Sequence, residues 1–162
     1  MSRLNKSAPQ NADAPDVSER RVRLALLARI ETGVLEAARA EIAPDLPAYR
    51  MVKQPETGLA MVQARAGGTG TAFNFGEMSL TRCVVALDDG VLGVGYVAGR
   101  DRHKAELVAL FDALAQSGQW RARLEHLLFA PARSHQATAQ TARAAQVAAT
   151  RVDFFTMVRG ED

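Results

Sequence analysis

The sequence has few of the residues that build cross-linked or metal-stapled folds. Cys83 is the single cysteine among 162 residues, which excludes an internal disulfide and a zinc site made of several cysteines. The three histidines, His103, His126 and His135, lack the clustered spacing of a metal site. We therefore expect this chain to bind no metal and to hold no cofactor on its own.

Long apolar runs and an excess of charge of one sign are also missing. No apolar stretch approaches the roughly 20 residues of a membrane span, and Met1 to Lys6 leads into no signal-peptide core. Lysine and arginine together number 20 against 18 acidic residues, which gives a net charge of +2. This balance argues against nucleic-acid binding. We expect a soluble, cytoplasmic protein that contacts neither nucleic acid nor membrane.

Familiar catalytic patterns are absent too. There is no G-x-S-x-G elbow, and Cys83 lies within a predicted strand without an activating neighbour. Lysine is scarce: three of the 20 basic residues are lysines, so the remaining 17 are arginines. Arginine favours bidentate contacts with carboxylates and phosphates and is common in interfaces. A compositional bias of the genome would explain the same excess at least as well.

Aromatic residues make up only 6% of the chain, so the adjacent Phe154 and Phe155 near its end stand out. Chain ends are usually polar, whereas burying a Phe, Val or Met side chain stabilises by roughly 1.5–3 kcal/mol. The segment therefore either completes the core of its own domain or binds a partner. The residues predicted to form a partner interface are Arg151, Val152, Phe154, Phe155, Met157, Val158 and Arg159.

The length fits one domain, which we place at residues 17–162 after a disordered, proline-containing segment of residues 1–16. A helical hairpin is expected first. Its first helix opens near Ser18, Gly33 interrupts or caps it, and the second helix ends before Pro44 and Pro47.

An antiparallel β-meander of about four strands is predicted next. The expected strands are Tyr49 to Lys53, Gly58 to Ala66, Glu77 to Leu87, and Val91 to Val97. Asp88-Asp89-Gly90 is a strong hairpin signal, and Gly93 and Gly95 indicate close backbone approach or a bulge.

C-terminal helices and the apolar tail complete an α+β fold. Asp101 is placed to cap a helix that runs to Gly118. A further helix from Trp120 to Phe129 is expected to break at Pro131. An alanine-rich helix follows from about Ser134 to Thr150. Its weak apolar face predicts that it is solvated or packs closely against another helix.

Two segments are candidates for binding an anion. The loop with Arg65, Gly67, Gly68, Thr69 and Gly70 offers successive backbone N–H groups. It lacks the lysine of a P-loop, and a plain hairpin connection is the favoured interpretation. Arg100 and Arg102 flank the start of a predicted helix, where anions bind readily, although solvated charges at a capped helix start are the more ordinary interpretation.

Three segments taken together resemble the PhnG family of the bacterial carbon–phosphorus lyase system. They are Thr57-Gly58-Leu59 through Gly70, Gly99-Arg100-Asp101 with Ala105-Glu106, and Arg151 through Gly160. The resemblance covers about residues 20–162. The family pattern has a histidine where this chain has Lys104, so no role of that imidazole is carried over.

The resemblance implies a structural or accessory subunit that assembles with PhnH, PhnI and PhnJ. With PhnH, PhnI and PhnL, such a subunit is required to transfer the ribose 5-triphosphate of ATP to an alkylphosphonate with release of adenine. PhnI is the expected catalytic subunit of this step. PhnJ later cleaves the product with an iron–sulfur cluster and S-adenosylmethionine.

Three hypotheses follow for the chain itself. It serves assembly alone, or it lends Arg65, Arg100 and Arg102 to the substrate site, or it is a stand-alone anion- or nucleotide-binding regulatory module.

Overall fold

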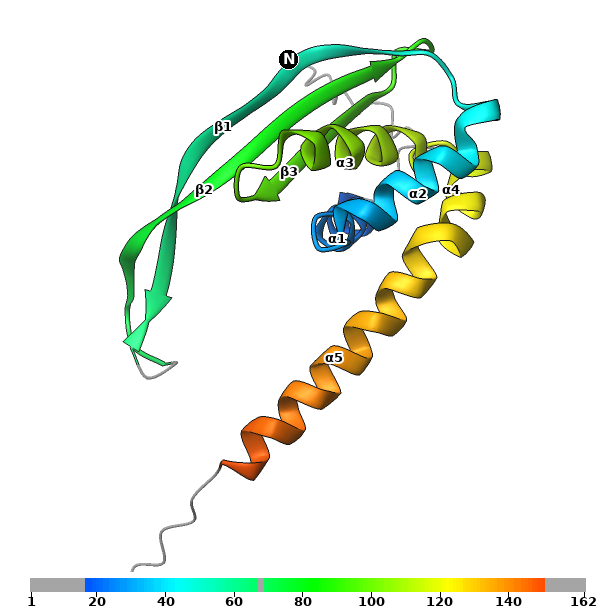
Figure 1. Cartoon of the computed structure of the whole chain (residues 1–162). Helices are drawn as coiled ribbons and strands as arrows, with labels where there is room; N and C mark the ends of the chain where they lie inside the picture. Colours follow the sequence, from blue (N-terminus) through cyan, green and yellow to red (C-terminus); the bar gives the residue numbers. More distant parts are fainter. Residues whose placement is uncertain (1–16, 67–68, 151–162) are drawn as a thin grey trace, which may run out of the picture.

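The computed structural model describes residues 17–66 and 69–150. It confirms an α+β fold in which helices flank an antiparallel sheet of order β1-β2-β3 (Figure 1). In chain order the elements are α1 (Val17–Leu27), α2 (Thr32–Ile42), the 3-10 turn η1 (Ala43–Asp45), β1 (Tyr49–Arg65), β2 (Ala72–Leu87), β3 (Leu92–Ala98), α3 (Arg102–Leu114), α4 (Gly118–Leu124), the π-helical turn η3 (Glu125–Phe129) and α5 (Ala130–Ala149).

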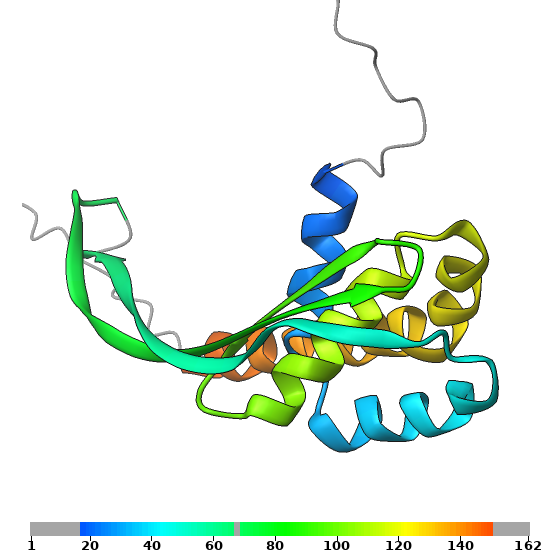
Figure 2. The same cartoon turned by 90° about the horizontal axis from the view of Figure 1, so that it is seen from above.

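Helix α3 is the centre of the core. Every residue from Leu107 to Leu114 is buried, and Phe111 is fully covered. One side of α3 packs on β2 and β3, while α1 and α2 pack elsewhere on the same helix (Figure 2). Apart from Asp112, every residue from Leu107 to Leu114 is apolar. A helix with apolar residues on all sides is buried on all sides, which explains the central position of α3.

Gly93 and Gly95 let α3 approach β3 closely, as the sequence predicted. A Cβ atom at Gly93 would clash with the carbonyl oxygen of Ala109, and one at Gly95 would clash with that of Ala105. Alanine on the helix and glycine on the strand therefore bring the two backbones into direct contact.

The meander has three strands, so the prediction of about four was wrong in this detail. The two short strands expected from Tyr49 to Lys53 and from Gly58 to Ala66 are one strand, β1. Its pairing with β2 shifts in register between Met51 and Lys53, between Lys53 and Glu56, and between Val62 and Gln63. Pro55 is tolerated because β1 is an edge strand, which need not donate every N–H group. The next strand also begins earlier than predicted, at Ala72.

Two helix boundaries differ from the prediction. The break between α1 and α2 lies at residues 28–31, and Gly33 is inside α2. Pro131 does not end a helix: it lies at the start of α5, directly after the π-helical turn η3. The chain therefore stays helical from Gly118 to Ala149.

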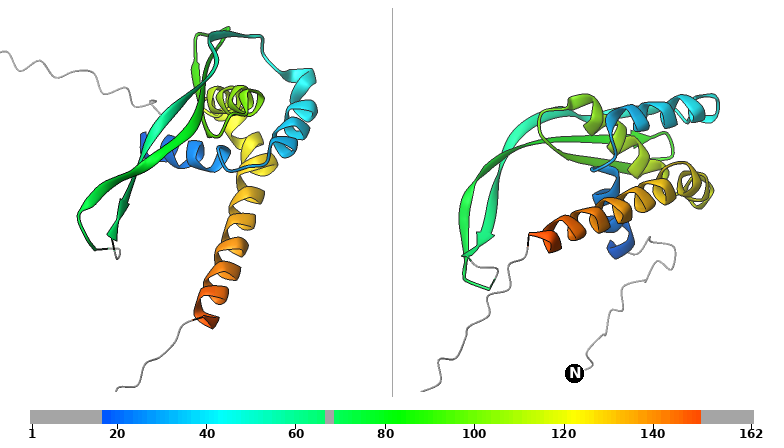
Figure 3. Two further views of the ribbon diagram at one scale, coloured as in Figure 1. Left: turned by 60° about the vertical axis from the view of Figure 1, so that its left-hand side comes forward. Right: turned by 60° about the horizontal axis from the view of Figure 1, so that its bottom comes forward.

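Two elements project from the core toward the same side of the molecule (Figures 1 and 3). One is the outer part of the β1–β2 hairpin, residues 57–65 and 72–79, which we call the outer arm. The other is α5, which has no buried residue. No helix in the described part of the chain is long and apolar enough to cross a membrane.

Candidate functional site

The outer arm meets the core at a shallow hollow lined by Thr57, Gly58, Leu59, Ser79, Arg100 and Arg102. A hydrogen-bonded turn shapes this hollow. Gly99, at φ +91°, donates its N–H to the Ser79 carbonyl at 2.8 Å. The buried Thr81 hydroxyl donates to the Gly99 carbonyl at 2.8 Å and lies 3.0 Å from the Thr57 hydroxyl. The turn after β3 is thereby tied to both strands of the arm.

Asp101 caps α3, as predicted. Its Oδ1 accepts the Lys104 backbone N–H at 2.8 Å, and its Oδ2 accepts the Thr32 hydroxyl of α2 at 2.8 Å. The pKa of the Asp101 carboxyl is below its ordinary value, chiefly because of the Lys104 N–H bond. His103 adds a second link to α2 through Glu36, with Nε2 3.0 Å from Oε1. The start of α3 is therefore held firmly.

Arg100 and Arg102 stand on either side of this cap. Neither guanidinium makes a hydrogen bond or ion pair with another residue in the described ranges 17–66 and 69–150. Both residues are exposed. Two unpaired guanidinium groups beside a helix N-terminus create a region of positive potential that favours binding of an anion.

Arg65 lies far from these two arginines. It pairs with Ala72 at the tip of the arm, whereas Leu59, which lines the hollow, pairs with Ser79. Six residues of strand separate the two positions, a span of about 20 Å. Arg65 donates to the Gly70 carbonyl at 3.0 Å, so the glycine-rich segment is a hairpin connection. Gly67 and Gly68 lie outside the described residues, and Thr69 is exposed.

Cys83 has the surroundings of a structural thiol. It is fully buried, and its Sγ lies 3.4 Å from the Lys53 carbonyl oxygen. Burial raises the pKa of the thiol to about 11. A thiol that stays protonated at neutral pH is a poor nucleophile. Within the described residues, no three histidine, cysteine or acidic side chains gather where they could hold a metal ion.

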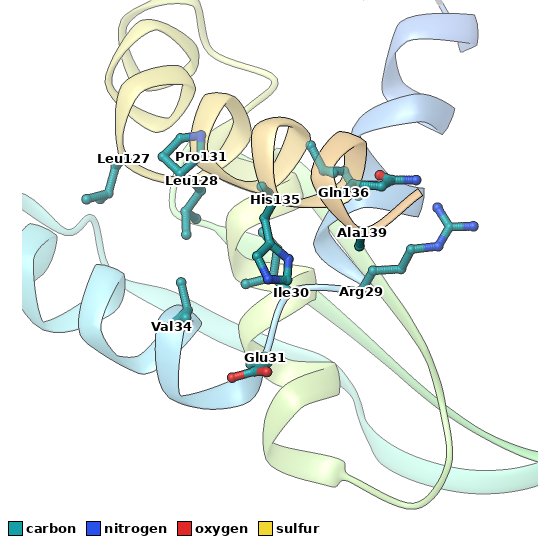
Figure 4. Close-up of a pocket in the computed structure, with 12 residues that line it drawn as sticks. Arg29, Ile30, Glu31, Val34, Leu127, Leu128, Pro131, His135, Gln136 and Ala139 are labelled. Carbon is teal, nitrogen blue, oxygen red and sulfur yellow. The ribbon is translucent and has the colours of Figure 1, made fainter. Parts of the chain in front are cut away.

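A feature missed at the level of sequence is an apolar groove of about 460 Å³ between the α1–α2 connection and the start of α5 (Figure 4). Leu26, Ile30 and Val34 line one side, and Leu128 and Pro131 line the other. The groove exists because α1 breaks before Gly33 and α5 continues through Pro131. Both points contradicted the sequence prediction, so no signal pointed to it.

The other missed feature is the exposure of apolar side chains on the outer arm. Leu59 is 69% exposed and Phe75 is 73% exposed; Met61, Phe73 and Met78 are also exposed. The Phe73 and Phe75 rings pack edge to face, with centroids 6.4 Å apart. The apolar pattern indicated strands correctly, but a pattern cannot show that no helix covers their outer half.

The tail residues predicted as a partner interface, Arg151, Val152, Phe154, Phe155, Met157, Val158 and Arg159, lie outside the described residues. The disorder predicted for residues 1–16 also falls outside them.

Comparison with known proteins places these features in a family. Residues 18–160 match the family described as "Phosphonate metabolism protein PhnG". The chain is 44% identical over 155 residues to the "Alpha-D-ribose 1-methylphosphonate 5-triphosphate synthase subunit PhnG" of Rhizobium meliloti (strain 1021), covering 96% of this chain and 98% of that protein. Both matches extend over nearly the whole sequence, and the chain therefore belongs to the PhnG family.

Proposed function

We propose that this chain is an accessory subunit of an alpha-D-ribose 1-methylphosphonate 5-triphosphate synthase, the activity that names its Rhizobium meliloti relative. In this role it supports transfer of the ribose 5-triphosphate of ATP to an alkylphosphonate, with release of adenine. It works in the cytoplasm in the breakdown of organic phosphonates and does not itself carry out the chemistry.

The observation that carries this proposal is the uncovered apolar surface of the outer arm. Phe75, Leu59 and Met61 are each more than half exposed. Large exposed apolar patches on a soluble protein mark surfaces that bind other proteins. Cys83, the one cysteine, is also a poor nucleophile, since it is buried with a raised pKa. A subunit that binds partners and leaves catalysis to them fits both facts.

The proposed partners are PhnH, PhnI and PhnJ in a core complex, together with PhnL. The tail from Arg151 to Arg159 supplies one contact, because its paired phenylalanines favour burial. Helix α5, which has no buried residue, is a second surface that gains cover on assembly. ATP, the iron–sulfur cluster and S-adenosylmethionine are then used by the complex, with the cluster held by the lyase subunit.

Anion binding by Arg100 and Arg102 is a second role within the same assembly. Their lack of partners in the described chain and their position at the α3 cap favour it. Arg65 and the loop through Gly67, Gly68, Thr69 and Gly70 would need a separate anion, because they lie about 20 Å away along the arm.

The test of the proposed function is co-expression of the tagged chain with the candidate partners, followed by native mass measurement. We expect a complex of fixed subunit ratio that forms ribose 1-phosphonate 5-triphosphate from ATP and a phosphonate. Omission of this chain should abolish product formation, and its addition back should restore it. A full-length chain without the tail residues 151–162 should assemble more weakly.

The stand-alone regulatory module makes the opposite prediction. Purification of a stable monomer that binds ATP by itself, and that none of the candidate partners retains, would overturn the subunit assignment. A chain with Arg100 and Arg102 changed to alanine serves as the matched control, because loss of ATP binding in that variant would locate the nucleotide site.

A further inference from the structure

The sheet contains an unfilled strand position beside the outer arm. Strand β3 pairs with residues Leu80 to Ala86 of β2, and the chain then turns away at Gly99. Residues 72–79 of β2 have no strand on that side within the described chain. The open position continues the line of β3 and runs from the tip of the hairpin to the Gly99 turn (Figure 1).

The backbone groups that face this position are available for pairing. The Ser79 carbonyl faces it, because this carbonyl accepts the Gly99 N–H. In an antiparallel ladder the side to which backbone groups point alternates along the strand. The N–H and C=O groups of Glu77 therefore face the open position as well, and Glu77 lies opposite Met61 without exchanging hydrogen bonds with it.

At the free edge of β3, side chains hydrogen-bond to backbone groups that point away from the sheet. The outward N–H group of Val94 donates to Asp112 Oδ2 at 2.9 Å. The outward carbonyl of Leu92 accepts Gln116 Nε2 at 2.7 Å and Arg20 at 3.2 Å. Side chains from α3 and α1 thus satisfy two of the groups that another strand would use, at the Leu92–Val94 end of this edge.

Among the described residues, no side chain hydrogen-bonds to the outward backbone groups of the outer arm, where a register shift between Val62 and Gln63 leaves Phe75 of β2 without a partner on β1. Residues 72–78 are all exposed, and Glu77 is the single charged residue among them. Phe73 and Phe75 together expose on the order of 200 Å². Leu59 and Met61 on one face of the arm and Met78 on the other face, where it pairs with Ala60, bring the exposed apolar surface of the two faces together to several hundred Å². This is a substantial share of the roughly 800 Å² that each partner buries in a stable interface.

The inner end of the position carries positive charge. Arg100 and Arg102 line the same hollow as Ser79, the residue at which the open position ends. Neither arginine has a hydrogen-bond or ion-pair partner in the described chain. A segment that fills the position therefore gains most if it is apolar along the arm and acidic where it reaches this turn. A nucleic acid or a lipid surface would instead need basic residues along the arm, where Arg65 is the only one.

We propose that the outer edge of β2 is a strand-addition site for a partner subunit, which contributes an extended apolar segment with carboxylates that meet Arg100 and Arg102. Backbone hydrogen bonds to β2 supply affinity, and the aromatic side chains of the arm select the apolar segment. This inference rests on the proposed function, because it identifies the surface through which the accessory subunit joins its complex.

The direct test compares Glu77→Pro with Glu77→Ala in the full-length chain. Proline removes the N–H group that faces the open position and leaves the β1 pairing intact, as expected for an edge residue. We expect Glu77→Pro to weaken binding to the partner subunits about tenfold relative to Glu77→Ala, while the unfolding midpoints of the two isolated variants stay close. Equal affinities would overturn the proposal.

A charge reversal gives a test that does not depend on proline. Arg100→Glu combined with Arg102→Glu should weaken binding about tenfold and remove part of its salt dependence. Arg50→Glu is the matched control, because Arg50 is exposed, has no partner in the described residues and pairs with Ala86 at the other end of the sheet. Unchanged affinity with a raised Michaelis constant for ATP would assign the arginines to substrate phosphate and overturn this contact.

Other occupants give different results. A homodimer of the isolated chain that Glu77→Pro dissociates would show that a second copy fills the position. Protection of residues 72–79 in the isolated chain that disappears when residues 151–162 are removed would show that its own tail does so. Either result would overturn the partner assignment. Failure of the unmodified chain to bind any partner would instead refute the proposed function itself.

Discussion

The inner and outer halves of the same two strands have opposite surroundings. In the inner half, Val85 and Cys83 of β2 are fully buried beneath α3, and β3 covers one edge. In the outer half, Phe75 and Leu59 are largely exposed, and the edge that β3 covers farther along is open. Both halves are rich in apolar residues, so composition does not separate them.

The difference shows which apolar residues stabilise the isolated chain by burial and which remain exposed until another protein covers them. Residues that contact α3 contribute to folding, since their burial removes apolar surface from water. The exposed side chains of the outer arm, such as Leu59 and Phe75, bury less apolar surface when this chain folds, and they carry the risk of aggregation that open edges bring. Their retention is explained if burial occurs on assembly.

Two phenylalanines test this division most strongly. Phe111 is fully buried in α3, whereas Phe75 is 73% exposed on the arm. We expect Phe111→Ala to lower the free energy of unfolding by about 3–5 kcal/mol, and Phe75→Ala to change it by no more than about 0.5 kcal/mol. Urea unfolding of both variants measures this. A loss of several kcal/mol from Phe75→Ala would show that the arm is part of the folded core.

The blocked edge of β3 gives the second test. Asp112 is 2% exposed, and its Oδ2 lies 2.6 Å from Arg20 Nη2 while also accepting the Val94 N–H. Asp112→Ala leaves both donors without this acceptor, so we expect a loss of about 3 kcal/mol. Asp45→Ala, which removes an exposed ion pair with Arg123 on α4, is the control and should cost no more than about 1 kcal/mol. Similar small losses from the two variants would mean that the buried carboxylate is dispensable.

Two glycines also differ between the inner and outer halves of the sheet. Gly95 touches the α3 backbone, and an added Cβ would clash with Ala105, whereas a Cβ at Gly76 of the outer arm would meet nothing within 4 Å. We expect Gly95→Ala to destabilise by about 1–3 kcal/mol and Gly76→Ala to have an effect within about 0.5 kcal/mol. Thermal unfolding distinguishes them. Equal effects would contradict the close approach of β3 and α3.

The smallest effect is expected at the boundary between the halves, where Asp101 caps α3. Asp101→Ala should cost about 1 kcal/mol at pH 7. Because the pKa of Asp101 is lowered in the folded chain, the charged cap stabilises fully above the unfolded value near 4. This stabilisation is lost as the pH falls through the lower folded pKa.

Unfolding measured from pH 7 to pH 2 therefore should show the difference between the wild type and Asp101→Ala shrinking below about pH 4. Asp101→Asn is the control, since a neutral amide also caps and its contribution should not follow this titration. A wild-type advantage that grows toward low pH would contradict the role of the charged cap.

The elements that carry strong local signals were predictable from the sequence. Asp88-Asp89-Gly90 marked the hairpin, and Gly90 has φ +86°, which glycine adopts readily. Asp101 marked the start of α3. Pro55 misled the strand prediction because proline is excluded from central strands only, and the sequence does not show which strand lies at an edge.

The site was less predictable for the same kind of reason. The spacing of Arg65 and Arg100 suggested two anion-binding segments, but the length of β1 decides that they lie at opposite ends of the arm. Exposure of Phe73 and Phe75 depends on where α3 ends relative to the sheet, which is a property of tertiary packing. The family resemblance, in contrast, rested on motifs that the sequence displays directly.

Hydrogen exchange of the β2 backbone amides tests directly whether a partner strand pairs with the outer arm. In the isolated full-length chain, amides from Thr81 to Leu87 should exchange slowly, and those facing the open edge between Ala72 and Ser79 should exchange fast. In the assembled complex, the outer group should become protected as a partner strand pairs with it. Outer amides that stay fast in a complete complex, or that are already slow in the isolated chain, would contradict the account.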